Sequence, residues 1–245
     1  MKKILTFSLL TMILGAPGLA LSAGGGAHLE EANIDLTDKD SIERGAEYFF
    51  DYCIGCHSLE YERYTTITEG LDLSEDEVTE RFIHTRDEKG MPSAVGSLIK
   101  IAMRPEDAEE WFAQPAPDLT LTARQRGADW IYSMLKGFYL DDETTFGVNN
   151  RVFEDMGMPH VLWELQGWQE NVGEGDDVEL ELKEEGRMST EEYDDMVRDI
   201  TAFMTYMGEP ERLERERLGV WALGFLVIFT LLAYLLKKEY WRDVH

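Results

Sequence analysis

The chain has 245 residues, and its 49 acidic side chains outnumber 23 basic ones, which gives a formal net charge of −26 at pH 7. This charge excludes nucleic acid as a partner, because phosphates would be repelled, and favours a basic protein partner attracted over long range. The sequence holds no metal-binding helix motif, glycine-rich phosphate loop or nucleophile elbow, so no catalysis by the isolated chain is predicted.

Residues 1–23 are typical of a secretory signal peptide. Two lysines are followed by an apolar run over residues 4–14 and then by small residues. Cleavage after Ala20, Ser22 or Ala23 fits the preference for small residues equally well. A glycine and a proline interrupt the apolar run, which favours cleavage over an uncleaved anchor and predicts that the body is exported.

The first element of that body is a helix that opens at residues 40–44, with Asp40 or Ser41 as its N-cap. Apolar residues recur at helical spacing from Ala46 to Cys53, as on the buried face of an amphipathic helix. The helix therefore brings the first cysteine to its C-terminal end in a defined position relative to the core.

Cys53, Cys56 and His57 form a C-x-x-C-H run, which is the attachment pattern of a c-type haem. Each thiol can add to one haem vinyl group, and the adjacent histidine then serves as the proximal iron ligand. A short disulfide would be expected beside a βαβ pattern, and a zinc site needs four ligands in a chain with only 2 cysteines. The run therefore predicts one covalently attached haem c.

The remaining exported body is predicted to be mainly helical with loops. Helices are expected from Ser74 to about Thr85, over 105–112, over 122–139 with Trp130, Met134 and Leu135 on one face, and over 190–207 with an apolar methionine-rich stripe. The intervening segments are a stiff proline turn at 115–119, an ordered loop at 145–168, and an acidic solvated insertion at 170–195 with a hairpin through 178–182.

The second long apolar stretch, at 218–236, is predicted to be a transmembrane helix, because 19 uncharged residues nearly match a hydrocarbon core of about 30 Å. Trp221 and Trp241 are interfacial anchors, and Lys237 and Lys238 follow the span directly. The positive-inside preference places the tail at 237–245 in the cytoplasm. The domain at 24–217 is then periplasmic, and the protein is a single-pass protein of the bacterial inner membrane.

Several phrases of the chain are similar to those of one family. The chain resembles the cytochrome c1 family, the haem subunits of ubiquinol–cytochrome c reductase (cytochrome bc1) complexes, in its proteobacterial form. The matching stretches are residues 44–46 (RGA), 103–108 (MRPEDA), 116–120 (APDLT), 126–130 (RGADW), 147–150 (GVNN), 157–163 (GMPHVLW) and 235–241 (LLKKEYW).

The resemblance implies a fold, an activity and partners. The fold is a cytochrome-c-like helical haem domain with long loop insertions and one C-terminal transmembrane helix. The haem would accept single electrons from the Rieske iron–sulfur protein and pass them to cytochrome c. The other implied partners are cytochrome b and the membrane, within a dimeric complex of the respiratory chain. Some relatives carry an extra disulfide, which this chain lacks the cysteines to form.

The sixth iron ligand is the main open question at the level of residues. A methionine would raise the haem potential, and Met91 and Met158 both lie in a Gly-Met-Pro context, with Met103, Met156 and His160 as further candidates. Spacing alone does not choose among them, whereas the resemblance assigns the ligand to Met158. The metal ligands implied are thus His57 and Met158.

Two further haem contacts are expected. The resemblance implies that Arg126 pairs with a haem propionate, with Arg124 as the alternative, since a guanidinium matches a carboxylate fork. Pro117 or Pro115 can offer a backbone carbonyl to the free ring nitrogen of His57 and so orient the imidazole.

Two other functions compete with the electron-transfer subunit. A free-standing membrane-anchored cytochrome c shares the haem and the anchor, but long insertions are not needed in a simple shuttle. A haem-free acidic surface protein with a short disulfide is the alternative from another class, and the absence of visible absorbance would favour it.

Overall fold

The computed structural model describes residues 28–86, 90–101, 103–173 and 178–244. The predicted signal peptide at 1–23 lies outside this part of the chain. Within it the elements are mostly helices, joined by long connections and three small two-stranded sheets. The expected class, a mainly α domain followed by one long apolar helix, is confirmed.

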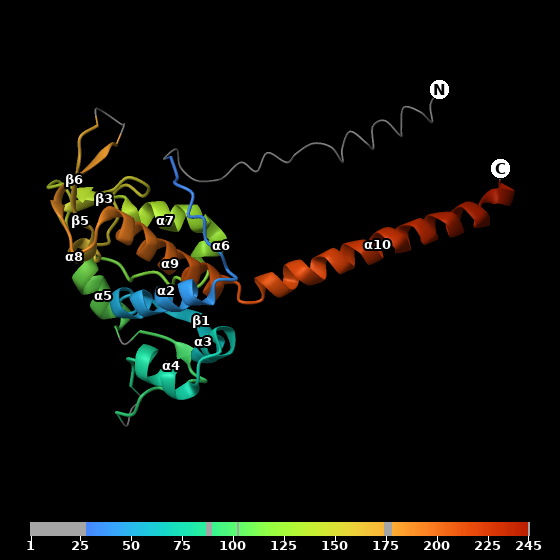
Figure 1. The fold of residues 1–245 in the computed structure, drawn as a ribbon, viewed down its shortest axis with the longest axis horizontal. Coiled ribbons are helices and arrows are strands. Elements are labelled where there is room, and N and C mark those ends of the chain that lie inside the picture. The colour runs from blue at the N-terminus through green and yellow to red at the C-terminus, as the bar shows by residue number, and fades with distance from the viewer. Residues whose placement is uncertain (1–27, 87–89, 102, 174–177, 245) are drawn as a thin grey trace.

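Helices α2 (Lys39–Tyr52) and α9 (Thr190–Gly208) lie side by side at the centre of the body (Figure 1). Each is amphipathic, and their apolar faces form the middle of one core, in which Phe49 and Phe203 meet at 5.4 Å between ring centroids. The N-cap of α2 is Asp38, whose side chain accepts from Ser41 N, so the prediction of Asp40 or Ser41 was wrong by two or three residues. The predicted stripe on α9 is confirmed as buried.

The contact between α2 and α9 is close because Gly45 has no side chain. A Cβ added there would lie 2.0 Å from the Asp199 carbonyl oxygen. Asp199 is only 7% exposed, and its carboxylate accepts hydrogen bonds from Ser41 Oγ at 2.5 Å and from Arg44 Nε at 2.7 Å. A buried carboxylate needs such partners to offset its desolvation, so this cluster ties the two helices together.

One flank of the central pair is formed by α6 (Thr122–Arg126) and α7 (Ala128–Lys136), which both contact α9. A single helix over 122–139 was predicted, and that prediction was wrong. Gly127 has φ +93°, a left-handed conformation that interrupts the helix and that glycine adopts without strain. The last predicted residues belong instead to β3 (Phe138–Leu140), which pairs antiparallel with β4 (Val148–Asn150).

The other flank holds α3 (Tyr64–Leu71) and α4 (Glu75–Phe82). Ser74 and Glu77 form a capping box at the start of α4, which confirms the predicted start, while the helix ends three residues earlier than expected. The strands β1 (Leu59–Arg63) and β2 (Leu98–Ile99) pair antiparallel. Figure 1 labels β1 next to α3.

The segments between the flanks include α5 (Pro105–Phe112), which matches its predicted bounds. The loop predicted at 145–168 is shorter than expected, since it holds β4, α8 (Trp163–Gln166) and the start of β5. The predicted hairpin is present, with β5 (Gly167–Asn171) paired antiparallel to β6 (Leu180–Glu185). Its first strand lies earlier in the chain than predicted.

The last long element is α10 (Arg212–Tyr240), followed by the short turn η1 (Arg242–Val244). Its 29 residues span about 43 Å at 1.5 Å per residue, which exceeds a hydrocarbon core of about 30 Å. Figure 1 shows it leaving the body as an isolated rod. Among the described residues it is the one helix long and apolar enough to cross a membrane, and no residue of its apolar window is buried.

Candidate functional site

The C-x-x-C-H run begins where α2 ends. Cys53 is the C-cap of this helix, and its backbone N–H donates to the Phe49 carbonyl. Its own carbonyl accepts from Cys56 N at 3.1 Å and from His57 N at 2.9 Å. The chain thus continues for one more helical turn, and residues three and four positions apart face the same side. The two thiols and the imidazole are therefore presented together.

Both thiols are free in the structure, with Cys53 buried and Cys56 half-buried, so they form no short disulfide. Burial raises the pKa of Cys53 to about 12 and also raises the pKa of Cys56. Thiols with raised pKa values are weak nucleophiles at neutral pH. At neutral pH both side chains are therefore present mainly as thiols rather than thiolates.

The His57 ring is oriented by the backbone of a distant segment. Its Nδ1 lies 2.8 Å from the Pro117 carbonyl oxygen. A carbonyl can only accept, so Nδ1 carries the proton and Nε2 keeps its lone pair, as a metal-ligating imidazole requires. Desolvation lowers the pKa of this histidine, which favours the neutral ring needed for coordination.

Asp118 holds the orienting carbonyl in place, and it was not singled out from the sequence. One carboxylate oxygen accepts from Ser58 Oγ at 2.8 Å and from Glu60 N at 2.7 Å. The other oxygen accepts from Thr120 N at 2.9 Å, which closes a local turn. An aspartate that follows a proline is a turn signal, and this signal could have drawn attention to it.

Met158 lies in the loop between β4 and α8 and is partly buried. Asn150 fixes the start of this loop, since its Oδ1 accepts from Val152 N at 2.9 Å and its Nδ2 donates to the Met134 carbonyl at 2.8 Å. Gly157, the residue before Met158, lies close to Gln114, which precedes Pro117 by three residues. A Cβ added to Gly157 would be 2.8 Å from Gln114 Nε2. The structure thus joins His57 and Pro117 directly, and it brings Gly157, the residue before Met158, close to Gln114 in the segment that leads to Pro117.

Arg126 ends α6 with its guanidinium over the ring of Trp130, at 5.3 Å from the centroid. Trp130 in turn meets Phe153 of the Met158 loop at 6.1 Å between ring centroids. No salt bridge of Arg126 occurs among the described residues, so its charge is available to an anionic group. Arg124 is exposed and lies beside the end of α9.

The alternative iron ligands occupy different environments. Met91 is 61% exposed, which disfavours it as a ligand of a buried iron. Met103 and Met156 are partly buried. His160 is buried, and desolvation lowers its pKa to about 4, with a smaller opposing effect from Gln166 and Gly167.

These residues fit a c-type haem. The donor set combines two free thiols on one helical turn, an imidazole whose Nε2 retains its lone pair, and a partly buried thioether on the loop between β4 and α8. Imidazole and thioether are the axial ligands of high-potential cytochromes. The arginine without a salt bridge adds the charge that a propionate requires.

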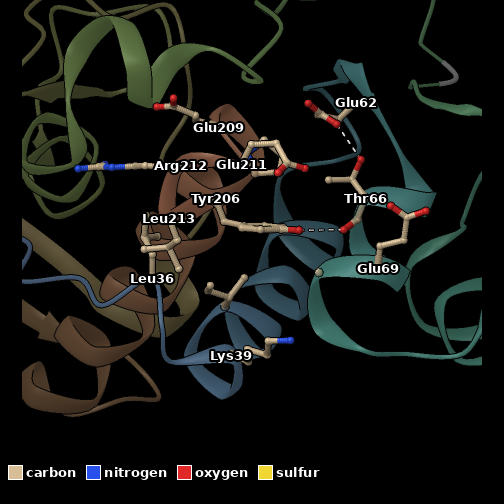
Figure 2. A pocket seen from close by; sticks show the side chains of 13 residues that line it. Leu36, Lys39, Glu62, Thr66, Glu69, Tyr206, Glu209, Glu211, Arg212 and Leu213 are labelled. Atoms are coloured by element: carbon tan, nitrogen blue, oxygen red, sulfur yellow. Dashed lines mark hydrogen bonds between the residues drawn. The ribbon is translucent and has the colours of Figure 1, made fainter. Parts of the chain in front are cut away.

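A separate cavity of about 430 Å³ lies where α2, α3, α9 and the start of α10 meet (Figure 2). Tyr206 lies across it and donates to the Thr66 carbonyl at 3.0 Å, while Thr66 Oγ1 donates to Glu62 at 2.7 Å. Burial, followed by the charges of three nearby glutamates, raises the pKa of Tyr206 to about 12. The lining includes none of the candidate haem residues, so this cavity is not the site of the predicted chemistry.

Comparison with known proteins agrees with the geometry. Residues 30–244 match the model of the Cytochrome C1 family. Cytochrome c1 of Allochromatium vinosum is 50% identical, over 97% of this chain and 98% of that protein. The mitochondrial cytochrome c1 haem protein of Saccharomyces cerevisiae is 31% identical, over 94% of this chain and 74% of that protein.

One relative carries a different name. The ammonia monooxygenase gamma subunit of Nitrosomonas europaea is 43% identical to this chain, over 99% of the chain and the full length of that protein. Its similarity therefore extends over the whole chain, as does that of the Allochromatium vinosum protein.

Proposed function

The chain belongs to the cytochrome c1 family, and on this basis we propose that it is the electron-transfer haem subunit of a ubiquinol–cytochrome c reductase (cytochrome bc1) complex. The observation that carries the proposal is the Nδ1 contact of His57 with the Pro117 carbonyl, at 2.8 Å. It leaves the other ring nitrogen available, beside two free thiols. This arrangement suits an axial ligand next to covalent attachment points.

The cofactor is proposed to be one haem c, attached by thioethers to Cys53 and Cys56 and ligated by His57 and Met158. When bound, such a haem supplies a one-electron redox centre whose potential depends on its axial ligands and its burial. Pro117 orients the proximal imidazole. Arg126 pairs with a propionate, which exchanges its ring contact for a charge-assisted hydrogen bond.

The proposed electron path runs from the Rieske iron–sulfur protein through this subunit to cytochrome c. A carrier at that point needs a relatively high potential, which a thioether ligand provides. The formal charge of −26 supports a basic acceptor, since opposite charge speeds encounter at low salt. Cytochrome b and a second copy of the complex complete the proposed dimeric assembly.

The proposed location is the bacterial inner membrane, crossed once by α10. The domain at 24–217 lies in the periplasm after removal of residues 1–23, and the tail at 237–245 lies in the cytoplasm. Lys237 and Lys238 in the last turn of α10 support this orientation through the positive-inside preference. The seven residues at 211–217 before the apolar span balance in charge and provide no opposing signal.

The name of the Nitrosomonas europaea relative provides a second candidate, a subunit of a monooxygenase assembly. The two candidate functions, a cytochrome bc1 subunit and a monooxygenase subunit, can be distinguished by the proteins that are bound to the chain in the membrane. A free-standing anchored cytochrome c is separated by the same experiment.

A tagged full-length chain, solubilised from its own membranes in mild detergent, is expected to co-purify with a di-haem cytochrome b and a Rieske iron–sulfur protein. Deletion of the chain is expected to abolish electron transfer from quinol to cytochrome c, because the acceptor side of the complex would be lost. Co-purification with monooxygenase subunits, or isolation of the chain alone with quinol oxidation intact after its deletion, would contradict the proposal. Cells complemented with the untagged gene serve as the control.

A further inference from the structure

A stack of aromatic rings begins two residues after Met158. His160 is 5% exposed. Its imidazole lies parallel to the ring of Phe138 in β3, with 4.8 Å between centroids and 8° between planes. It also meets Trp168 of β5 edge to face at 5.9 Å. Trp168 in turn stacks on Trp163, at 5.4 Å and 13°. The exit of the Met158 loop is thus held between two sheets and α8.

The imidazole is held mainly by contacts with neighbouring rings rather than by hydrogen bonds to its nitrogens. Among the described residues neither ring nitrogen of His160 makes a hydrogen bond of good geometry. Its polar neighbours are the Gln166 side chain and the Gly167 backbone, and Gln166 Oε1 is also buried without a partner. Buried polar atoms are normally paired, so the poorly paired nitrogens of this flat ring lower the stability of the folded chain. Offset and edge-to-face contacts of flat rings fix orientation as well as burying area.

The two ends of the loop are anchored by different means. At its entry, Asn149 Oδ1 accepts from Asp155 N at 3.0 Å, and Asn150 Oδ1 accepts from Val152 N at 2.9 Å and Phe153 N at 3.2 Å. At its exit, the backbone of His160 only accepts a long bond of 3.4 Å from Trp163 N. The ring stack is therefore the main restraint on the exit. Met158 lies two residues before this stack and three residues after Asp155, the last anchored residue of the entry.

We propose that His160 is a positioning residue that keeps the Met158 thioether on the haem iron by locking the loop exit into the Phe138–Trp168 ring stack. The inference rests on the proposed function, in which Met158 is the sixth ligand. A thioether is a weak ligand, so the conformational freedom of the residues that carry it competes directly with coordination. A ring packed against both Phe138 and Trp168 limits that freedom two residues from the sulfur.

The test compares His160→Phe and His160→Ala in the full-length haem-loaded chain. The readouts are the weak long-wavelength absorption band of methionine-ligated ferric haem and the reduction potential. His160→Ala is expected to lose at least half of the band, and to shift the potential at least halfway toward that of Met158→Leu. His160→Phe is expected to keep both, because the flat ring remains. Ile67→Ala, a buried residue of α3 on the opposite flank, controls for general loss of stability.

Three outcomes would overturn the inference. An unchanged band and potential in His160→Ala would show that the loop exit needs no ring. Equal losses in His160→Phe and His160→Ala would show that a ring nitrogen matters, either as a hydrogen-bond partner or as the ligand itself. An equal loss of the band and potential in Ile67→Ala would show that the effect comes from a general loss of stability. A wild-type chain with no band at all would instead refute Met158 as ligand, which is a failure of the proposed function.

Discussion

Replacement of Met158 by leucine is expected to leave the haem attached while lowering its reduction potential by about 0.2–0.3 V, roughly a third of the ~0.8 V range that axial ligands set. The thioethers to Cys53 and Cys56 do not depend on the sixth ligand. Loss of the sulfur removes the ligand that favours the reduced iron, so the potential falls. Electrons would then reach the subunit poorly, and reduction of cytochrome c would slow strongly. Redox titration of the visible spectrum measures the shift.

Met156→Leu is the matched control for this substitution. It changes the same residue type two positions earlier in the same loop, and Met156 is also partly buried. The account expects a potential close to that of the wild-type chain. A normal potential in Met158→Leu, combined with a lowered one in Met156→Leu, would transfer the ligand to Met156. A normal potential in both variants would leave Met91, Met103 or His160 as the candidates for the sixth iron ligand.

Gly45→Ala is expected to destabilise the body by about 3 kcal/mol or more, in the upper range of overpacking substitutions. Alanine is favoured over glycine within a helix by about 1 kcal/mol, which opposes this loss. The close contact outweighs that gain, because the new Cβ would lie 2.0 Å from the Asp199 carbonyl oxygen. Separation of α2 from α9 would also strain the hydrogen bonds of Ser41 and Arg44 to the Asp199 carboxylate.

Thermal unfolding of the detergent-solubilised chain, followed by circular dichroism, measures this effect. Gly96→Ala is the control, since no described atom lies within 4 Å of the added Cβ and the φ of Gly96 is not positive. The control is expected to change stability by about 0.5 kcal/mol at most, as for an ordinary surface site. Equal stability of the two variants would show that α2 and α9 can separate without cost.

The helices with clear periodicity could be predicted from the sequence because burial of one face decides them. The apolar spacing before Cys53 and the stripe on α9 both indicated buried faces, and the structure confirms both. The capping signal at Ser74 placed the start of α4 correctly. The break at Gly127 was missed, because a single glycine within a helical pattern is often tolerated, and only its left-handed backbone here ends α6.

The attachment residues could be predicted because their chemistry depends on local spacing. The partners of that motif come from far along the chain, so they depend on tertiary structure. The sequence could not choose between Pro115 and Pro117 as the carbonyl facing His57, 60 residues away, whereas in the structure the contact is to Pro117. The His160 ring stack could not be predicted for the same reason, whereas the turn signal at Asp118 was present in the sequence but its contacts with Ser58 and Glu60 were not.

The most direct test of the account is intact mass spectrometry of the mature chain purified from its own membranes. Under denaturing conditions the polypeptide is expected to retain the mass of one haem, because thioethers to Cys53 and Cys56 survive unfolding, whereas axial ligation does not. The Cys53→Ala, Cys56→Ala double variant should lose that mass. A wild-type polypeptide without added mass, or with a disulfide between the two cysteines, would contradict the central claim.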